Sequence, residues 1–190
     1  FFLLIGSGAN GKSRLLDVVE GIVGKEHVAA VQPCQLENRF QRGHLQGKLV
    51  NIITELAKDK EIPDAELKAI TSGELMTAEH KFKEPFSFHV YATCWFGTNH
   101  MPRTRDVSNA FFRRAVVLTF NRIFVEHEQD RRLKKKLQAE LSGILNLALE
   151  ALGDVHNRGF FTTAPSVELE KMRWKSAADH VPDFIEECCE

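Results

Sequence analysis

The hydrophobic pattern divides the first two thirds of the chain into short apolar runs separated by amphipathic or polar stretches. Apolar residues at helical spacing cover 14–23 and 64–71, which predicts helices there. Residues 74–89 alternate loosely, as in a hairpin with a basic tip. The continuous apolar runs, which are typical of buried strands, are residues 1–5, 28–31, 48–55, 89–98 and 111–120.

The last third of the chain has a helical pattern. Apolar residues recur every three or four positions over 133–152, which predicts an amphipathic helix that ends near Gly153 and Gly159. A final helix is expected over 166–189, with an interruption near Pro182. A basic cluster at the start of the first of these helices is interpreted as a solvated face.

The order of these elements predicts an α/β fold. Strands alternating with helices, followed by helices alone, indicate a central, mostly parallel sheet flanked by helices, with a C-terminal helical extension. We expect an ATPase core over 1–125 and a helical segment over 126–190. The 190 residues suit one domain, or one domain with an appendage. Because the first run starts abruptly, in mid-strand, we expect the chain to be a piece of a longer protein.

Charge and composition narrow the function classes. The net charge of −1 shows no global basic excess, which argues against a free-standing DNA-coating protein but leaves room for local basic loops. No apolar window approaches the length of a transmembrane helix, so we expect no membrane contact. The cysteines form no C-x-x-C pair, and we expect reduced thiols in a cytoplasmic protein: Cys34, Cys94, Cys188 and Cys189.

The segment between the first predicted strand and the first predicted helix carries the pattern G-x-x-x-x-G-K-S, the phosphate-binding P-loop. Its glycines let the backbone N–H groups approach phosphate oxygens, and the new helix directs its positive end at the same anion. Lys12 can reach the β- and γ-phosphates, and the Ser13 hydroxyl is a ligand for Mg²⁺. The predicted nucleotide-binding residues are Gly6, Ser7, Gly8, Ala9, Asn10, Gly11, Lys12, Ser13 and Arg14.

Two further polar residues follow predicted strands. Glu55 ends the run 48–55, and Asn99 follows the run 89–98. Because ligands of open α/β sheets bind beyond the carboxyl ends of the strands, both are expected to meet the P-loop. Glu55 would orient the attacking water or hold Mg²⁺ through water, and Asn99 would contact the water and the γ-phosphate. The alternatives are a surface glutamate at a strand end and an ordinary turn.

Basic residues suggest contacts with a neighbouring nucleotide and with DNA. Arg113 or Arg114 could reach the nucleotide of an adjacent subunit as an arginine finger, the alternative being a pair of salt-bridged surface arginines. A basic and aromatic loop suits single-stranded DNA, since charge holds the backbone and rings stack on bases. The candidates there are Lys68, His80, Lys81 and Lys83, interleaved by Phe82, and solvated lysines are the alternative.

With its motifs in this order, the chain resembles the superfamily 3 helicase domain of phage and plasmid primase-helicases, related to the poxvirus primase-helicase type. The pieces that carry the resemblance span nearly the whole chain. They are GSGANGKS (6–13), LVNIITEL (49–56), LKAITSGELMTAEHKFKEPFSF (67–88), FGTNHMP (96–102), FFRRAVVLTF (111–120) and LQAELSGILNLALEAL (137–152).

This resemblance implies an AAA+-like P-loop ATPase that forms a ring, usually a hexamer, hydrolyses ATP with Mg²⁺ between subunits and moves along single-stranded DNA. It implies a primase domain in the same chain of the full-length protein and the cytoplasm of a bacterial host cell. Carried over by position, Glu55 is the motif B acid, Asn99 the sensor and Arg114 the finger, with Arg113 as the alternate. Lys68 and residues 79–83 fall in the segment that builds the DNA-contacting hairpin.

The chain departs from the family pattern in three places. Ser72-Gly73-Glu74 stands where two glycines and an aspartate are common, Glu79 stands where a basic residue is frequent, and the tryptophan often found in the later helix is replaced near Leu147. Three other interpretations stay open: a nucleoside-phosphate kinase, a small GTPase and a non-catalytic prophage remnant. A GTPase is disfavoured because the sequence has no N-K-x-D stretch. The intact motif residues argue against a remnant.

Overall fold

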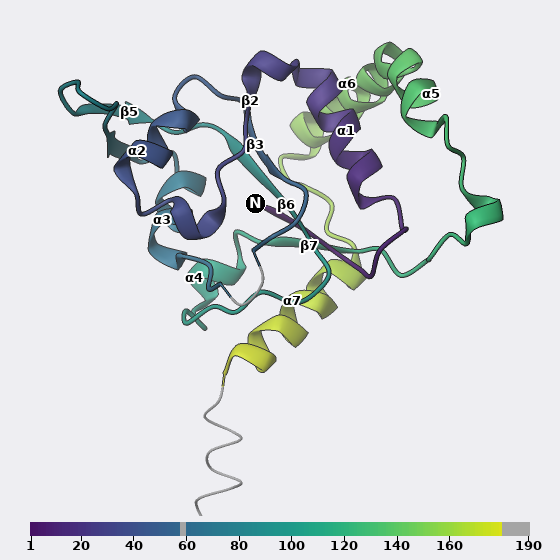
Figure 1. The fold of residues 1–190 in the computed structure, drawn as a ribbon. Helices are drawn as coiled ribbons and strands as arrows, with labels where there is room; N and C mark the ends of the chain where they lie inside the picture. The colour runs from purple at the N-terminus through teal and green to yellow at the C-terminus, as the bar shows by residue number, and fades with distance from the viewer. Residues whose placement is uncertain (58–59, 180–190) are drawn as a thin grey trace, which may run out of the picture.

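A computed structural model describes residues 1–57 and 60–179 and shows a five-stranded sheet between two groups of helices (Figure 1). The sheet has the strand order β2-β3-β6-β1-β7, and every neighbouring pair is parallel. The predicted α/β class with a mostly parallel sheet is therefore confirmed. The strands are β1 (Phe2–Ile5), β2 (Val28–Ala29), β3 (Val50–Ile53), β6 (Thr93–Thr98) and β7 (Val116–Thr119).

Helices cover both faces of this sheet. α1, α5 and α6 lie together on one side, and α2, α3 and α4 lie on the other (Figure 1). α7 packs along the edge strand β7. The helices are α1 (Lys12–Val23), α2 (Arg39–Arg42), α3 (Asp64–Thr71), α4 (Asn109–Phe112), α5 (Leu133–Ala139), α6 (Leu141–Arg158) and α7 (Pro165–Ala178).

Two hydrophobic clusters hold the layers together. The smaller joins Leu4 of β1 and Ile52 of β3 to Leu16 of α1. The larger fills the opposite face, where Trp174 of α7 makes edge-on contacts with the rings of Phe111 and other aromatic residues. Because Trp174 is only 1% exposed, the last described helix contributes directly to the core of the sheet. The division of the chain at residue 125 stays a prediction.

The hairpin predicted over residues 74–89 is present as an antiparallel pair. β4 (Leu75–Ala78) pairs with β5 (Phe86–His89), with Leu75 opposite His89 and Ala78 opposite Phe86. The pair is a separate two-stranded sheet. It extends from the side of the molecule away from the loop between β1 and α1 (Figure 1).

Three local predictions differ from the structure. Residues 111 and 112 end the short helix α4 instead of starting a strand, because the Ser108 hydroxyl accepts a hydrogen bond from the Phe111 N–H and caps that helix. The predicted helix over 133–152 is two helices, interrupted at Glu140. α6 continues through Gly153 and ends at Gly159, whose left-handed backbone (φ 78°) suits a helix end.

The remaining sequence predictions concern termini, thiols and membranes. The end of the last predicted helix, with Cys188 and Cys189, lies outside the described residues. In the described part, Cys34 is exposed and Cys94 is buried, and both are free thiols. Within residues 1–57 and 60–179, no helix combines the length and the apolar character needed to cross a bilayer.

Candidate functional site

The carboxyl ends of three neighbouring strands converge on one cavity. β3, β6 and β1 are adjacent in the sheet and parallel, so their carboxyl ends share one edge. β3 leads to Glu55, β6 leads to Asn99, and β1 leads into the loop 6–11 that precedes α1. All three segments line a cavity of about 510 Å³. The structure therefore brings together the P-loop and the two strand-end residues that the sequence singled out.

The backbone of the loop 6–11 is held close to β7. A Cβ on Gly6 would collide with the Phe120 carbonyl oxygen, which explains why glycine stands there. The Asn10 amide donates to the Phe120 carbonyl at 3.2 Å. Ala9 (φ 57°) and Gly11 (φ 93°) both have left-handed backbone, and Gly11 is the N-cap of α1. These turns place the start of α1 against the cavity.

Lys12 lies at the centre of the site and is only 6% exposed. Its ammonium donates to the side-chain oxygens of Asn10 and Asn99, each at 3.2 Å, and to the Gly6 carbonyl. Burial lowers the pKa of Lys12, while the nearby Glu55 carboxylate opposes that change. Among the described residues, no carboxylate forms an ion pair with Lys12, and the hydrogen bonds of this buried cation go to neutral oxygens. Such a group favours an incoming anion.

The other predicted residues of the P-loop and motif B occupy the cavity walls. Residues 8–14, Glu55 and Asn99 line it, whereas Gly6 and Ser7 are not among its lining residues. Ser13 is exposed, and Arg14 pairs with Asp17 at 2.7 Å. The Glu55 backbone oxygen accepts from the Gln32 side-chain amide at 3.0 Å, which fixes the segment after β3.

Part of the cavity wall was missed by the sequence reasoning. Besides Thr54, it consists of Leu133, the first residue of α5, and of the segment between β7 and α5, with Phe124, Glu128, Gln129 and Asp130. The Phe124 N–H donates to the Ala9 carbonyl at 2.9 Å, so this segment is tied directly to the P-loop. The sequence predicts a strand over 111–120, but only the structure shows that this strand lies beside β1 and so brings the following residues to the same edge.

The cavity suits a phosphate that carries its own metal. Within residues 1–57 and 60–179, no group of three or more histidine, cysteine or carboxylate side chains could hold a metal ion. The Ser13 hydroxyl and the Glu55 carboxylate are two oxygen donors, which fits Mg²⁺ that takes its remaining ligands from phosphate and water. Lys12 and the N–H groups at the start of α1 supply the donors that an anion needs.

The two arginines lie at the other edge of the sheet. Arg113 and Arg114 precede β7, at its amino end, and neither lines the cavity. Arg113 is exposed, while the guanidinium of Arg114 donates to the Ser72 hydroxyl at 2.8 Å and to the Ala110 carbonyl. The structure therefore separates both arginines from the cavity of their own chain.

Three of the four predicted DNA-contacting residues lie at the hairpin tip. The His80 ring stacks on Phe86, and the Lys83 N–H donates to the His80 carbonyl at 2.9 Å, which closes the turn. Phe82 is 92% exposed with left-handed backbone (φ 64°), and the Lys81 ammonium lies 5.0 Å from its ring centroid. Lys68 instead belongs to α3, where it pairs with Asp106 at 2.6 Å. Contact with DNA stays a prediction for all four, and the ion pair makes Lys68 the weakest.

Comparison with known proteins places this site in a family. Residues 4–114, which include the P-loop, Glu55 and Asn99, match the family of unknown function DUF5906. The chain belongs to this family. The match ends at Arg114, so α5, α6 and α7 lie outside the shared region.

The chain is similar in sequence to a viral protein and similar in fold to solved structures. A protein of Acanthamoeba polyphaga mimivirus named "Putative helicase" is 26% identical over 143 residues. Two apo structures of the NrS-1 C-terminal region superpose with TM-scores of 0.61 and 0.60 at 17% and 18% identity, each over 75% of this chain. At that identity the likeness concerns the fold. The viral match includes 72% of this chain but only 15% of the viral protein. The chain likewise spans about a third of the NrS-1 region.

Proposed function

We propose that this chain is the ATP-hydrolysing motor domain of a DNA helicase of the superfamily 3 type, from a replication protein of a phage, prophage or plasmid. ATP and Mg²⁺ bind in the cavity at the carboxyl edge of the sheet. Hydrolysis takes place between adjacent copies in a ring, usually a hexamer, and drives movement along single-stranded DNA. In the full-length protein a primase domain belongs to the same chain, which works in the cytoplasm of the bacterial host.

One observation carries this proposal: the Lys12 ammonium contacts Asn99 at 3.2 Å in a cavity that Glu55 also lines. A phosphate-binding lysine, a strand-end acid and a strand-end amide are the parts that hydrolysis of a nucleoside triphosphate requires. The similarity to a viral protein named "Putative helicase" supports the same proposal.

Each residue then has a chemical role. Lys12 exchanges its neutral partners for the β- and γ-phosphates and neutralises charge that develops during transfer. Ser13 supplies an oxygen to Mg²⁺, which stabilises the negative charge of the phosphates when it is bound. Glu55 orients and polarises the attacking water, and Asn99 holds that water against the γ-phosphate.

The position of Arg114 supports hydrolysis between subunits. Because Arg114 lies at the amino edge of the sheet and the cavity at the carboxyl edge, it serves a neighbour's nucleotide. A head-to-tail contact of this kind uses two different surfaces, and it closes into a ring when the rotation between adjacent copies completes a full circle. The exposed, basic and aromatic hairpin tip supplies the contact with single-stranded DNA, with Lys81 and Lys83 on phosphates and Phe82 on a base.

Release of phosphate from Mg·ATP by the full-length protein, with and without single-stranded DNA, tests the proposal. We expect DNA to raise the rate several-fold. Phosphate transfer that depends on a nucleoside monophosphate acceptor would instead indicate a kinase. Absence of hydrolysis under both conditions would indicate a non-catalytic protein, and either outcome contradicts the motor.

A further inference from the structure

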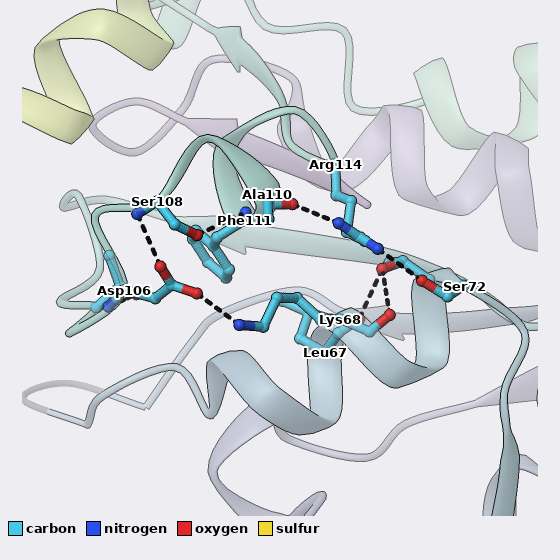
Figure 2. Close-up of polar contacts among 10 residues, drawn as sticks. Leu67, Lys68, Ser72, Asp106, Ser108, Ala110, Phe111 and Arg114 are labelled. Carbon is cyan, nitrogen blue, oxygen red and sulfur yellow. Dashed lines mark hydrogen bonds and ion pairs between the residues drawn. The ribbon is translucent and has the colours of Figure 1, made fainter.

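Two contacts fasten α3 to the segment that carries Arg114 (Figure 2). In the first, the Lys68 ammonium pairs with the Asp106 carboxylate at 2.6 Å. In the second, the Arg114 guanidinium donates to the hydroxyl of Ser72, the C-cap residue of α3, at 2.8 Å. The two contacts lie at opposite ends of the segment 106–114. They therefore fix both the beginning and the end of α4 against one helix.

The Asp106 contact sets the start of α4. One carboxylate oxygen accepts from Lys68, and the other accepts the Ser108 N–H at 2.7 Å. Ser108 in turn caps α4 through the Phe111 N–H. The Asp106 side chain is 12% exposed, so this charge is well shielded from solvent. An ion pair that is shielded and shares its carboxylate with a backbone N–H constrains geometry more than an open surface pair does.

The partners of Arg114 are both neutral. Its guanidinium donates to the Ala110 carbonyl and to the Ser72 hydroxyl, and no carboxylate of residues 1–57 or 60–179 forms an ion pair with it. This excludes, within the described chain, the salt-bridged surface arginine that the sequence left open. A guanidinium has five N–H donors, so two neutral acceptors orient it while its charge and remaining donors stay available for an anion.

We infer that Ser72 is a positioning residue for Arg114: its hydroxyl presets the guanidinium for a phosphate bound by an adjacent copy. The Lys68–Asp106 ion pair holds the start of α4 at a fixed position relative to α3. This inference rests on the proposed function, because only a phosphate in trans needs Arg114 to be preset. The hairpin strand β4 starts at Leu75, so the helix end that holds Arg114 also leads into the hairpin.

Steady-state ATP hydrolysis by the full-length protein with single-stranded DNA tests this inference. We expect Ser72→Ala to lower kcat about tenfold with little change in KM or in binding of a fluorescent ATP analogue, because Arg114 acts on the transition state. Ser72→Thr keeps the hydroxyl and should retain most of the rate. Ser142→Ala, at an exposed serine of α6, is the matched control and should leave both constants unchanged.

A double-mutant comparison distinguishes an effect through Arg114 from a general loss of folded protein. If Ser72 acts through Arg114, then Ser72→Ala should have no additional effect in the Arg114→Ala background. Equal slowing in both backgrounds, an unchanged kcat for Ser72→Ala, or failure of Ser72→Thr to restore the rate would overturn the inference. Hydrolysis that depends on Arg114 but not on Ser72 contradicts only this positioning role. A wild-type protein that does not hydrolyse ATP contradicts the proposed function itself.

Discussion

The Lys12 ammonium donates a hydrogen bond to the Asn99 side-chain oxygen at 3.2 Å, across 87 positions of sequence. This contact joins the start of α1 to the residue after β6. It exists because β1 and β6 are parallel neighbours, with Ile5 opposite Thr98, so that both strands end at the same level. A nucleotide phosphate that displaces this contact would lie between the two side chains.

Replacing Asn99 should separate binding from catalysis. We expect Asn99→Ala to lower kcat for ATP roughly a hundredfold, because the attacking water loses a positioned partner. Binding of a non-hydrolysable ATP analogue should change little, since Lys12 and the loop backbone remain. Asn146→Ala, an exposed amide on α6, is the control. If Asn99→Ala weakens analogue binding as much as it slows turnover, then Asn99 stabilises bound ATP and the transition state equally. The sensor assignment would then be wrong.

Replacing Arg114 should abolish hydrolysis without abolishing binding. We expect Arg114→Ala to lower kcat about a thousandfold, because the neighbouring γ-phosphate loses a counter-charge in the transition state. Mixtures of Arg114→Ala and Lys12→Ala proteins should recover part of the activity, since a mixed interface unites an intact cavity with an intact arginine. Mixtures that stay inactive, although light scattering shows assembly, would contradict a finger supplied in trans.

Phe82 at the hairpin tip should lower the stability of the protein while it contributes to nucleic-acid binding. Phe82 has left-handed backbone and an almost fully exposed ring, a combination that costs folding energy without burying apolar surface. We expect Phe82→Gly to raise the free energy of unfolding by about 0.5–1 kcal/mol and to weaken single-stranded DNA binding about tenfold. Denaturant unfolding and fluorescence anisotropy measure the two effects.

Phe161→Gly is the matched control for the hairpin experiment. Phe161 is also largely exposed but has no left-handed backbone. Its replacement should neither stabilise the protein nor weaken DNA binding. Unchanged DNA affinity for Phe82→Gly would remove the stacking role from this residue.

The Asp106 ion pair should make the free energy of unfolding depend on pH in the acid range. The Lys68 ammonium, helped by Ser108, lowers the pKa of Asp106 from 3.8 to about 2. A carboxyl with a depressed folded-state pKa stabilises the protein above its unfolded pKa, and that contribution disappears as the pH falls from about 4 to 2. With allowance for solvent screening it amounts to roughly 1–2 kcal/mol.

Denaturant unfolding of the wild type and Asp106→Asn measures this contribution. The two proteins should differ clearly at pH 6, and the difference should shrink as the pH approaches 2. Asp154→Asn, at an exposed position of α6, is the control and should follow the wild type at every pH. A difference between wild type and Asp106→Asn that is the same at pH 6 and pH 2 would show that Asp106 acts only through packing.

Motifs that combine local pattern with strand order could be predicted from the sequence. The P-loop, Glu55 and Asn99 were placed correctly at one edge, because parallel strands leave no other place for residues that follow their carboxyl ends. The hairpin was predictable from its alternation and its central proline.

Features set by tertiary contacts could not be predicted in this way. Phe111 resembles a strand residue in its hydrophobicity, but the Ser108 cap and the aromatic cluster around Trp174 make it helical. The pairing of Lys68 with Asp106 joins residues 38 positions apart in segments whose packing has no sequence signature. The segment 124–133 reads as a polar connection, and its place on the cavity wall follows only from the position of β7 beside β1.

ATP hydrolysis by Lys12→Ala tests the central claim most directly. The matched control is Lys25→Ala, at an exposed lysine in the turn after α1. We predict that the full-length wild type and Lys25→Ala hydrolyse Mg·ATP faster with single-stranded DNA, and that Lys12→Ala remains folded but loses turnover by at least a hundredfold. DNA-stimulated hydrolysis that persists at the wild-type rate in Lys12→Ala would contradict the assignment of this cavity as the site of ATP hydrolysis.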